Sequence, residues 1–204
     1  MKLHWSPRSP YVRKVMIAAH ELGLAEQIDC YRTVASMNQL NPALMVDNPL
    51  GKIPALVLDD RQALYDSFVI CAYLNDLAGD LSIFPRDPAS RLQSFKWHAM
   101  GNGLTDLLII WRNERSKPPE RQTAAWLDGF MAKFWATLAA LEADAANLSK
   151  EKLAIGHIAI GCALSYVDFR FADLNWRAEA PVLTSWYTEF AARPSALATE
   201  IVDG

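Results

Sequence analysis

The segment Ser-Pro-Arg-Ser-Pro-Tyr-Val-Arg-Lys-Val at residues 6–15 marks the passage from a strand into a helix. The short run Lys2–Trp5 before it favours a strand. Apolar residues then recur at helical spacing over Pro10–Leu22, and Gly23 is a typical helix stop. Serine is a preferred N-cap and proline is well tolerated at the first helical position, so the helix begins at Ser9 and the proline after it.

Outward from this unit, short apolar runs continue to alternate with helical periods. Ile28–Val34 is the second predicted strand, and the polar stretch after it leaves room for at most a short helix. The runs Ile53–Leu58 and Gln62–Tyr65 predict a hairpin, and Ser67–Leu77 predicts a helix capped by the residue at its start, Asp66 or Ser67. The predicted order is β-α-β-α-β-β-α.

Strand patterns are missing from the second half of the chain. Residues 79–88 carry two prolines and indicate a linker. The helical patterns that follow cover residues 89–116, 119–144, 155–171 and 181–192. We therefore expect a small α/β domain at residues 1–78 and an all-helical domain at residues 89–204.

Composition excludes several classes of protein. The net charge is −3 and Lys/Arg residues form no cluster, which argues against nucleic acid as a partner. No apolar run approaches the roughly 20 residues that cross a bilayer, and no signal-peptide pattern opens the chain. The three cysteines, Cys30, Cys71 and Cys162, are far apart, as expected for buried thiols in a reducing cytoplasm. The four histidines have no metal-ligand spacing.

The loop at the first helix suggests a site for an anion. A helix N-terminus presents free N–H groups and partial positive charge, and the Ser9 hydroxyl can donate a hydrogen bond. A thiolate held there would have a lowered pKa. The sequence shows no histidine partner for Ser9, so the serine is poorly equipped to be an acyl nucleophile itself. Taken alone, the serine could equally be only a helix cap.

Two further segments complete a pattern. Residues 48–56, Asn-Pro-Leu-Gly-Lys-Ile-Pro-Ala-Leu, place Pro54 at the entry to an apolar strand, where it leaves neighbouring backbone groups unpaired. X-Pro bonds in such turns are sometimes cis. Asp66 and Ser67 then open a helix, where a carboxylate is favoured and an acid can pair with an ammonium. A strand-edge proline and a plain helix cap are the alternatives.

With these three segments in this order, the sequence resembles the glutathione S-transferase family, in its bacterial YibF-like branch. Ser-Pro-Tyr-Val-Arg-Lys-Val at residues 9–15, the residue 48–56 segment and Asp66-Ser67 match the family's glutathione-site landmarks, and residues 156–164 and 166–170 resemble its core helix. The resemblance covers essentially the whole chain. It implies a thioredoxin-like N-terminal domain followed by an all-helical domain, and dimers.

The resemblance also implies roles for individual residues. Ser9 would contact the glutathione sulfur, and the backbone of Ile53 before a cis Pro54 would pair with the cysteinyl part. Asp66 and Ser67 would hold the γ-glutamyl end, and Lys52 is a candidate for the glycyl carboxylate. The candidates for walls of the second-substrate site, which are equally well explained as core or interface residues, are Tyr11, Trp111, Arg112, Tyr166 and Phe169.

Some positions depart from the family's pattern. A serine stands where redox-active members place a cysteine, which disfavours mixed-disulfide chemistry. Ser6 could replace Ser9, because the conformation of the loop cannot be read from sequence. Many members have a capping box before the core helix, but this chain has Ala154 and His157 there, so the helix needs another cap. His157 is expected to be structural. Asp168 and Arg170 are expected to form a buried ion pair.

The sequence and the resemblance together predict a cytoplasmic glutathione transferase, with glutathione as co-substrate and no metal, and the resemblance implies a homodimer. The glutathione thiolate would attack a small, hydrophobic electrophile, a reaction of the detoxification type. Two alternatives stay open: a regulatory protein of this fold without catalysis, and another glutathione-dependent reaction such as isomerisation, dehalogenation or ether cleavage.

Overall fold

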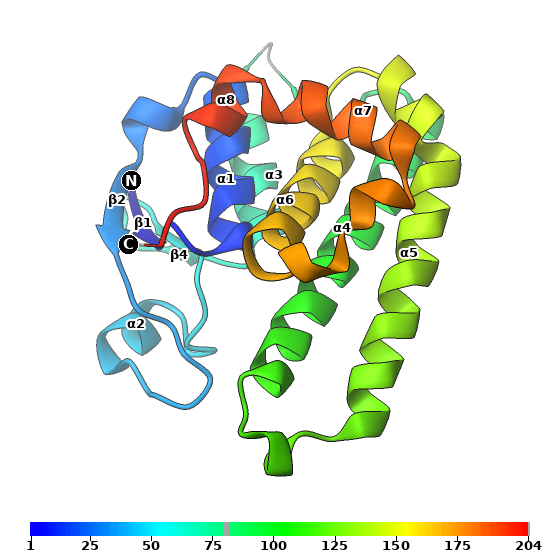
Figure 1. Ribbon diagram of the computed structural model, residues 1–204. Coiled ribbons are helices and arrows are strands. Elements are labelled where there is room, and N and C mark those ends of the chain that lie inside the picture. Colours follow the sequence, from blue (N-terminus) through cyan, green and yellow to red (C-terminus); the bar gives the residue numbers. More distant parts are fainter. Residues whose placement is uncertain (80–81, 204) are drawn as a thin grey trace. The chain divides into compact units, whose positions relative to one another are not determined.

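The computed structural model describes residues 1–79 and 82–203, which divide into two compact units (Figure 1). The first unit is Met1–Arg91 together with the chain from Pro194 onward, and the second is Leu92–Arg193. The helical domain predicted at residues 89–204 includes this C-terminal segment, which groups with the first unit in the structure. Of the predicted linker at 79–88, residues 80 and 81 lie outside the described residues.

The first unit contains a mixed four-stranded sheet in the order β2-β1-β3-β4. Its strands are β1 (Lys2–Trp5), β2 (Asp29–Arg32), β3 (Ala55–Val57) and β4 (Ala63–Leu64). β1 pairs with β2 in parallel and with β3 antiparallel, and β3 pairs antiparallel with β4. The predicted strands all form, although β2 and the hairpin are shorter than their apolar runs.

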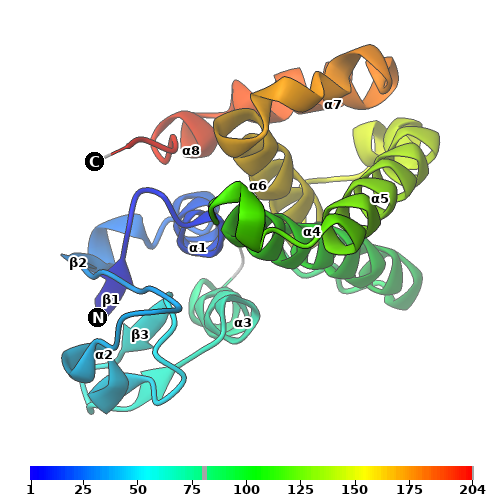
Figure 2. The same ribbon diagram turned by 60° about the horizontal axis from the view of Figure 1, so that its bottom comes forward.

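The helices of this unit cover both faces of the sheet. Figure 2 shows α1 (Pro10–Glu21) and α3 (Ser67–Leu77) together on one side and the short α2 (Pro42–Asp47) on the other. A 3₁₀ turn at Ala25–Gln27 precedes β2. Gly23, at φ +69°, follows the last turn of α1 as the sequence predicts. The predicted order of elements and the thioredoxin-like fold are confirmed.

The second unit is helical. It contains most of α4 (Pro88–Arg115), then α5 (Ala124–Lys150), α6 (Ile155–Arg170) and α7 (Pro181–Ala191). The 3₁₀ turns that join these helices are Pro119–Arg121, Ala172–Leu174 and Trp176–Ala178. Among the described residues, none of these helices combines the length and hydropathy that a bilayer span requires.

Glycines let α4 and α6 approach each other closely. A Cβ added to Gly101 would lie 2.5 Å from the backbone carbon of Ala159, and one added to Gly156 would lie 2.4 Å from the carbonyl oxygen of Ser94. Both distances are far below any real carbon contact, so only glycine fits there. The crossing also satisfies a helix end, because the N–H of Gly156 donates to the Ser94 hydroxyl at 3.2 Å.

The start of α6 has the alternative cap that the sequence called for. Nδ1 of His157 accepts a hydrogen bond from the Ala154 N–H at 3.1 Å, and Nε2 lies 3.2 Å from the carbonyl oxygen of Leu148. A carbonyl only accepts, so the ring is neutral with its proton on Nε2. Burial lowers the pKa of His157, which is consistent with that state. The structural role predicted for His157 is confirmed.

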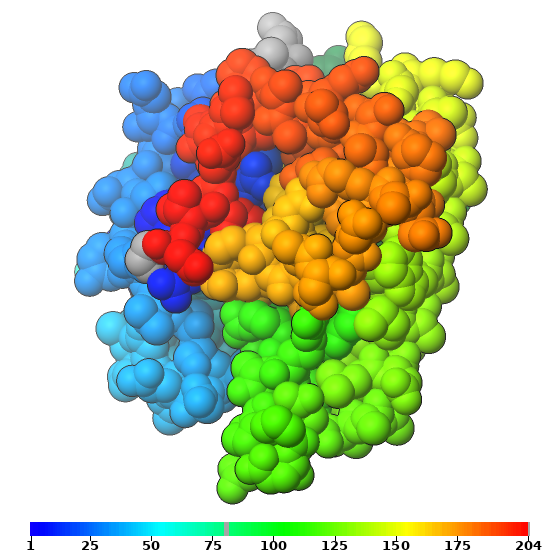
Figure 3. Space-filling model, viewed as in Figure 1, coloured from blue at the N-terminus to red at the C-terminus, as the bar shows by residue number. Residues whose placement is uncertain are grey.

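The C-terminal segment follows α1 along its length. It contains the short α8 (Pro194–Leu197), and Figure 3 shows it on the surface beside N-terminal residues. The Ser195 hydroxyl donates to the Glu21 carboxylate at 2.5 Å, and the buried Arg13 guanidinium donates to the Ala196 carbonyl at 3.1 Å. These contacts place the segment in the first unit.

Candidate functional site

The registers of the sheet bring three distant loops to one edge. β1 and β3 are antiparallel with His4 opposite Ala55, so β3 begins where β1 ends. β4 is antiparallel to β3 with Leu64 opposite Leu56, so it ends at that same edge. Continued by two residues or fewer, these registers bring the end of β1 level with Pro54 and Asp66. The Ser6–Ser9 loop, the entry to β3 and the start of α3 therefore share one edge.

Two helices begin at this edge. Ser9 is the N-cap of α1, and its hydroxyl oxygen accepts a hydrogen bond from the Val12 N–H at 3.3 Å. The hydroxyl proton is not used in that bond, so it can be donated to a ligand. No acidic side chain lies in the first turn of either helix. The N-terminus of α1 thus combines a positive helix end with a hydroxyl donor, which is an environment suited to an anion, whereas the N-terminus of α3 carries the Asp66 carboxylate.

The start of α3 is capped by Asp66. One carboxylate oxygen accepts hydrogen bonds from the N–H groups of Phe68, at 2.9 Å, and Val69, at 3.4 Å. Ser67 is the first residue of the helix and is buried. Of the two caps that the sequence allowed, Asp66 is therefore the one used.

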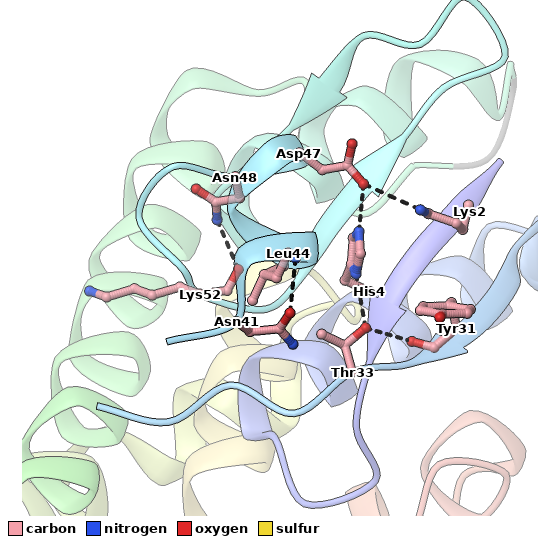
Figure 4. Close-up of polar contacts among 9 residues, drawn as sticks. All are labelled: Lys2, His4, Tyr31, Thr33, Asn41, Leu44, Asp47, Asn48 and Lys52. Carbon is pink, nitrogen blue, oxygen red and sulfur yellow. Dashed lines mark hydrogen bonds and ion pairs between the residues drawn. The ribbon is translucent and has the colours of Figure 1, made fainter. Parts of the chain in front are cut away.

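The turn before β3 contains a cis bond between Ile53 and Pro54. Its conformation depends on Asn48, whose side-chain amide donates to the Lys52 carbonyl at 2.8 Å and accepts from the Leu50 N–H at 3.1 Å (Figure 4). Figure 4 also shows the exposed Lys52 side chain extending away from the turn. An ammonium group thus stands beside the entry to β3.

Comparisons with known proteins agree with this arrangement. Family models for the glutathione S-transferase N-terminal and C-terminal domains match residues 8–77 and 124–189. A crystal structure of a glutathione transferase family member from Pseudomonas fluorescens Pf-5, with bound glutathione, is 41% identical over 99% of both chains, with a TM-score of 0.95. The chain belongs to the glutathione S-transferase family.

Other members are similar over the full length. A second structure of a transferase family member from Pseudomonas fluorescens Pf-5 holds S-(propanoic acid)-glutathione and is 40% identical over 100% of both chains, with a TM-score of 0.89. An uncharacterised GST-like protein, YibF of Escherichia coli strain K12, is 29% identical over 98% of each chain. The predicted family, its YibF-like branch and its fold are thereby confirmed.

The serines of the transferase loop differ in setting. Ser6 lies before the helix, where its hydroxyl accepts from the Arg8 N–H at 3.4 Å, whereas Ser9 lies at the helix end. Tyr11, in the first turn, is half-buried beneath the Lys14 ammonium, which is 5.5 Å from the ring centroid. Only Ser9 therefore combines a hydroxyl with the N-cap position of α1.

The predicted second-substrate residues are dispersed. Trp111 is 2% exposed and lies among the aromatic rings of the second unit, with ring centroids 4.9 Å from Phe171 and 6.0 Å from Phe134. It is a core residue, as the alternative interpretation of the sequence had it. Tyr166 is buried with its ring centroid 6.3 Å from that of Phe169.

The remaining candidate, Arg112, is exposed and donates to the neighbouring Asn113 at 2.7 Å. Phe169, in turn, carries the Arg170 guanidinium over its ring at 3.7 Å. The structure of the second unit therefore brings no two of these side chains together except Tyr166 and Phe169.

The predicted Asp168–Arg170 pair is wrong. Asp168 binds Arg177 instead, with nitrogen–oxygen distances of 2.6 and 2.7 Å, and also accepts from the Trp176 ring N–H at 2.9 Å. Side chains two positions apart on a helix point in different directions, which separates Asp168 from Arg170.

The cysteines were predicted to be buried. Cys71 and Cys162 are, but Cys30 on β2 is exposed. Burial of its sulfur and the adjacent Asp29 carboxylate raise the pKa of the Cys30 thiol, so it is not activated as a nucleophile. Among the residues that the structure describes, no group of three or more His, Cys, Asp or Glu side chains could hold a metal ion.

Sequence reasoning missed the polar residues behind the edge. His4 is hydrogen-bonded to Asp47, which directly precedes the residue 48–56 segment, yet no motif or spacing marks either His4 or Asp47. A histidine within a strand and a polar pair at the end of a short helix are individually common, so only the three-dimensional structure reveals the connection.

Proposed function

We propose that the protein is a glutathione transferase, which binds glutathione at this edge of the sheet and transfers a small electrophile to its sulfur. The observation that carries the proposal is the convergence of Ser9, the cis Ile53–Pro54 turn and Asp66-Ser67 beside two helix N-termini. Glutathione-bound relatives that match nearly the whole chain support it.

Each part of glutathione has a partner of matching chemistry in this proposal. The ammonium of the γ-glutamyl group pairs with the Asp66 carboxylate. The carboxylate of the same γ-glutamyl group accepts a hydrogen bond from Ser67 at the start of α3. The cysteinyl backbone pairs with the free backbone groups of Ile53, and Lys52 attracts the glycyl carboxylate. The thiol then lies at the Ser9 end of α1.

The reaction requires the thiolate form of the ligand. The hydroxyl of Ser9 and the positive end of α1 stabilise negative charge, so both lower the thiol pKa. The sulfur attacks an electrophilic carbon, a carbon–sulfur bond forms, and the leaving group departs with its electron pair. The thiol proton passes to solvent.

The chemistry of sulfur in the chain favours transfer over redox exchange. Position 9 carries no thiol, and the exposed Cys30 has a raised pKa. Mixed-disulfide chemistry therefore lacks a reactive protein thiolate. The ligand of one relative, S-(propanoic acid)-glutathione, is a thioether, the type of product that transfer to sulfur yields.

The proposal also covers the location and assembly of the protein. The three cysteines, all in the part of the chain that the structure describes, form no disulfide bond, which suits a cytoplasmic protein. A homodimer and a role in detoxification are proposed from family membership.

The central test replaces the donor, Ser9→Ala. Loss of a hydrogen bond to a charged group is worth about 1.5–3 kcal/mol, which corresponds to a rise of about one to two units in the thiol pKa. Turnover of a chloronitrobenzene electrophile at pH 6.5 should fall about 10- to 100-fold and recover in part at higher pH. Steady-state kinetics from pH 6 to 8 measure this.

Ser6→Ala is the matched control and should leave the pH profile unchanged. If Ser6→Ala abolishes turnover and Ser9→Ala does not, the sulfur contact is Ser6. Undiminished turnover in both variants overturns the proposed activation. Calorimetry with glutathione separates the classes: binding without turnover of any electrophile supports the regulatory alternative, and no binding at all refutes the proposal.

A further inference from the structure

A partly buried series of hydrogen-bonded polar side chains runs behind the candidate site, from β1 to the end of α2 (Figure 4). Both ring nitrogens of His4 are hydrogen-bonded: Nδ1 lies 2.8 Å from the Thr33 hydroxyl, and Nε2 lies 2.7 Å from the Asp47 carboxylate. The Lys2 ammonium lies 3.2 Å from the same carboxylate oxygen. The His4 side chain is only 3% exposed, whereas the Asp47 and Lys2 side chains are 23% and 41% exposed, so the contacts run from the interior to the surface.

This series resembles a hydroxyl–imidazole–carboxylate triad, but it is not arranged for nucleophilic catalysis. The Thr33 hydroxyl donates its proton to the Tyr31 carbonyl at 3.1 Å. Thr33 is itself buried, so a substrate carbonyl has no access to its oxygen. The hydrogen-bonded side chains of Thr33, His4 and Asp47 therefore have a structural role.

These hydrogen bonds fix α2, a helix that makes few other contacts with the rest of the protein. α2 has six residues, too few to be stable alone in water, and Leu44 is its one buried side chain. Its start is fixed by Asn41, which accepts from the Leu44 N–H at 3.1 Å. Its last residue, Asp47, is fixed by His4 and Lys2. The hydrogen bond from His4 is the largest cause that lowers the pKa of Asp47, so the carboxylate is charged at neutral pH.

The residue after this helix folds the turn that leads to Pro54. Asn48 is buried, and its side chain bonds to both the Leu50 N–H and the Lys52 carbonyl. The Gly51 N–H donates to the Asn48 carbonyl at 2.9 Å, and Gly51 itself adopts a φ of +64°. β3 begins only at Ala55, so the sheet does not pair Lys52 and Ile53. Their positions depend on the turn.

We propose that His4 and Asp47 are positioning residues for glutathione, which hold the Asn48–Lys52 turn in the conformation that presents the Ile53 backbone. This inference rests on the proposed function. Neither residue touches the ligand. They act by keeping the turn formed before glutathione arrives, so that binding does not have to order it.

The effect on affinity follows from populations. When only a fraction of molecules holds the competent turn, the apparent Kd rises by the inverse of that fraction. A variant that keeps the turn about one-tenth of the time thus binds glutathione about tenfold more weakly. Because the thiolate environment at Ser9 is unchanged, kcat should stay within about twofold while the KM for glutathione rises.

The test uses Asp47→Asn, His4→Asn and the double variant in the full chain. Asparagine at position 4 keeps an amide near the position of Nδ1 but loses the Nε2 bond to Asp47. Because His4 and Asp47 act through one hydrogen bond, the double variant should bind glutathione no more weakly than whichever single variant has the lower affinity. Asp59→Ala is the matched control, because Asp59 is 95% exposed and pairs only with the N-terminal amine.

A second readout does not need glutathione. Amide hydrogen exchange of the free protein should accelerate at residues 48–52 in Asp47→Asn and stay unchanged in α1 and α3. Faster exchange there together with a raised glutathione Kd supports the inference. A folded Asp47→Asn protein with unchanged Kd and unchanged exchange overturns it. If the wild type itself binds no glutathione, the proposed function fails, and the exchange data still decide whether the pair holds the turn.

Discussion

At the start of α6, His157 takes the part that a glutamate or glutamine plays in a capping box. Its Nδ1 accepts the N–H of Ala154, three residues before it, and its Nε2–H reaches Leu148. Unlike the amide of glutamine, the ring can gain a proton, and protonation would remove the acceptor. The cap therefore depends on pH.

The first prediction follows from the lowered pKa of His157. The unfolded chain binds a proton at pH values where the folded protein does not, so stability from this residue is complete above about pH 6.5 and is lost as pH falls. The slope is at most about 1.4 kcal/mol per pH unit. Urea unfolding of the wild type and of His157→Gln at pH 7.5, 6.5 and 5.5 measures it.

Glutamine is the matched variant because its amide can accept and donate like the neutral ring but does not titrate. The wild type should lose its advantage over His157→Gln as the pH falls, since all other titrating groups cancel in the difference. A difference that is constant from pH 7.5 to 5.5 would show that the cap survives protonation.

Single residues were predictable where their partners are local. Ser9 and Asp66 were identified because a cap bonds N–H groups only two or three positions away. The Asp47 carboxylate was not, because its partner His4 is 43 residues distant. For Asp168, the predicted partner was the nearby Arg170. The helix directs the Arg170 side chain away from Asp168, and Arg177, from the turn after the helix, binds Asp168 instead.

Between elements, the crossing of α4 and α6 depends on the absence of side chains. Gly101 on α4 meets the Ala159 backbone, and Gly161 on α6 meets the Phe190 ring of α7. Backbone atoms yield less than the end of a side chain, so Gly101 is the stricter of these positions.

We predict that Gly101→Ala and Gly103→Ala, two residues apart on α4, have opposite effects. At Gly101 the new methyl group forces the helices apart, which should cost about 1–3 kcal/mol or more. Gly103 has no atom within 4 Å of an added Cβ, so alanine there should stabilise the helix by about 0.8–1 kcal/mol. Thermal unfolding followed by circular dichroism compares the two.

The informative result is the sign of the change in stability for each variant. If Gly101→Ala is as stable as Gly103→Ala, the close crossing of α4 and α6 does not exist in solution. If both variants are destabilised, helix propensity does not control Gly103.

Element boundaries were predictable to within a residue or two where a cap or proline marks them, as at α1 and α3. The start of α5 was predicted at Pro119 and lies at Ala124. The reason is a side chain from α4: the Glu114 carboxylate accepts from the Thr123 N–H at 2.8 Å and also binds Lys117. The first turn of α5 is thus fixed by a residue that the local pattern does not contain.

For the whole molecule, the main departure from the predicted domains is the return of the chain to its first unit. Residues from Pro194 onward pack beside α1, where the Arg13 guanidinium and the Glu21 carboxylate depend on them for hydrogen bonds. No composition change marks this segment as different from the preceding helices, so sequence alone assigned it to the helical domain.

We predict that ending the chain after Arg193 selectively weakens the first unit. Arg13, 7% exposed in the intact chain, loses its carbonyl partner, and α1 loses the cover of α8. Amide hydrogen exchange should accelerate in α1 and β1 while α5 and α7 keep their protection.

Ending the chain after Glu200 is the control. It removes the Arg8–Asp203 ion pair, whose side chains are both half-exposed or more, and retains every contact of Arg13. The cost should stay below about 1 kcal/mol. Equal acceleration of α1 exchange in both truncated proteins would mean that the last residues, rather than α8, stabilise this unit.

The same return of the chain has a consequence during synthesis on the ribosome. The first unit cannot be completed when its own 91 N-terminal residues have emerged, because Arg13 still lacks the backbone around Ala196. About 100 further residues must be translated, which takes on the order of 5–20 s at 5–20 residues per second. Throughout that interval the nascent sheet unit lacks this partner of Arg13, which arrives only when the segment around Ala196 has been translated.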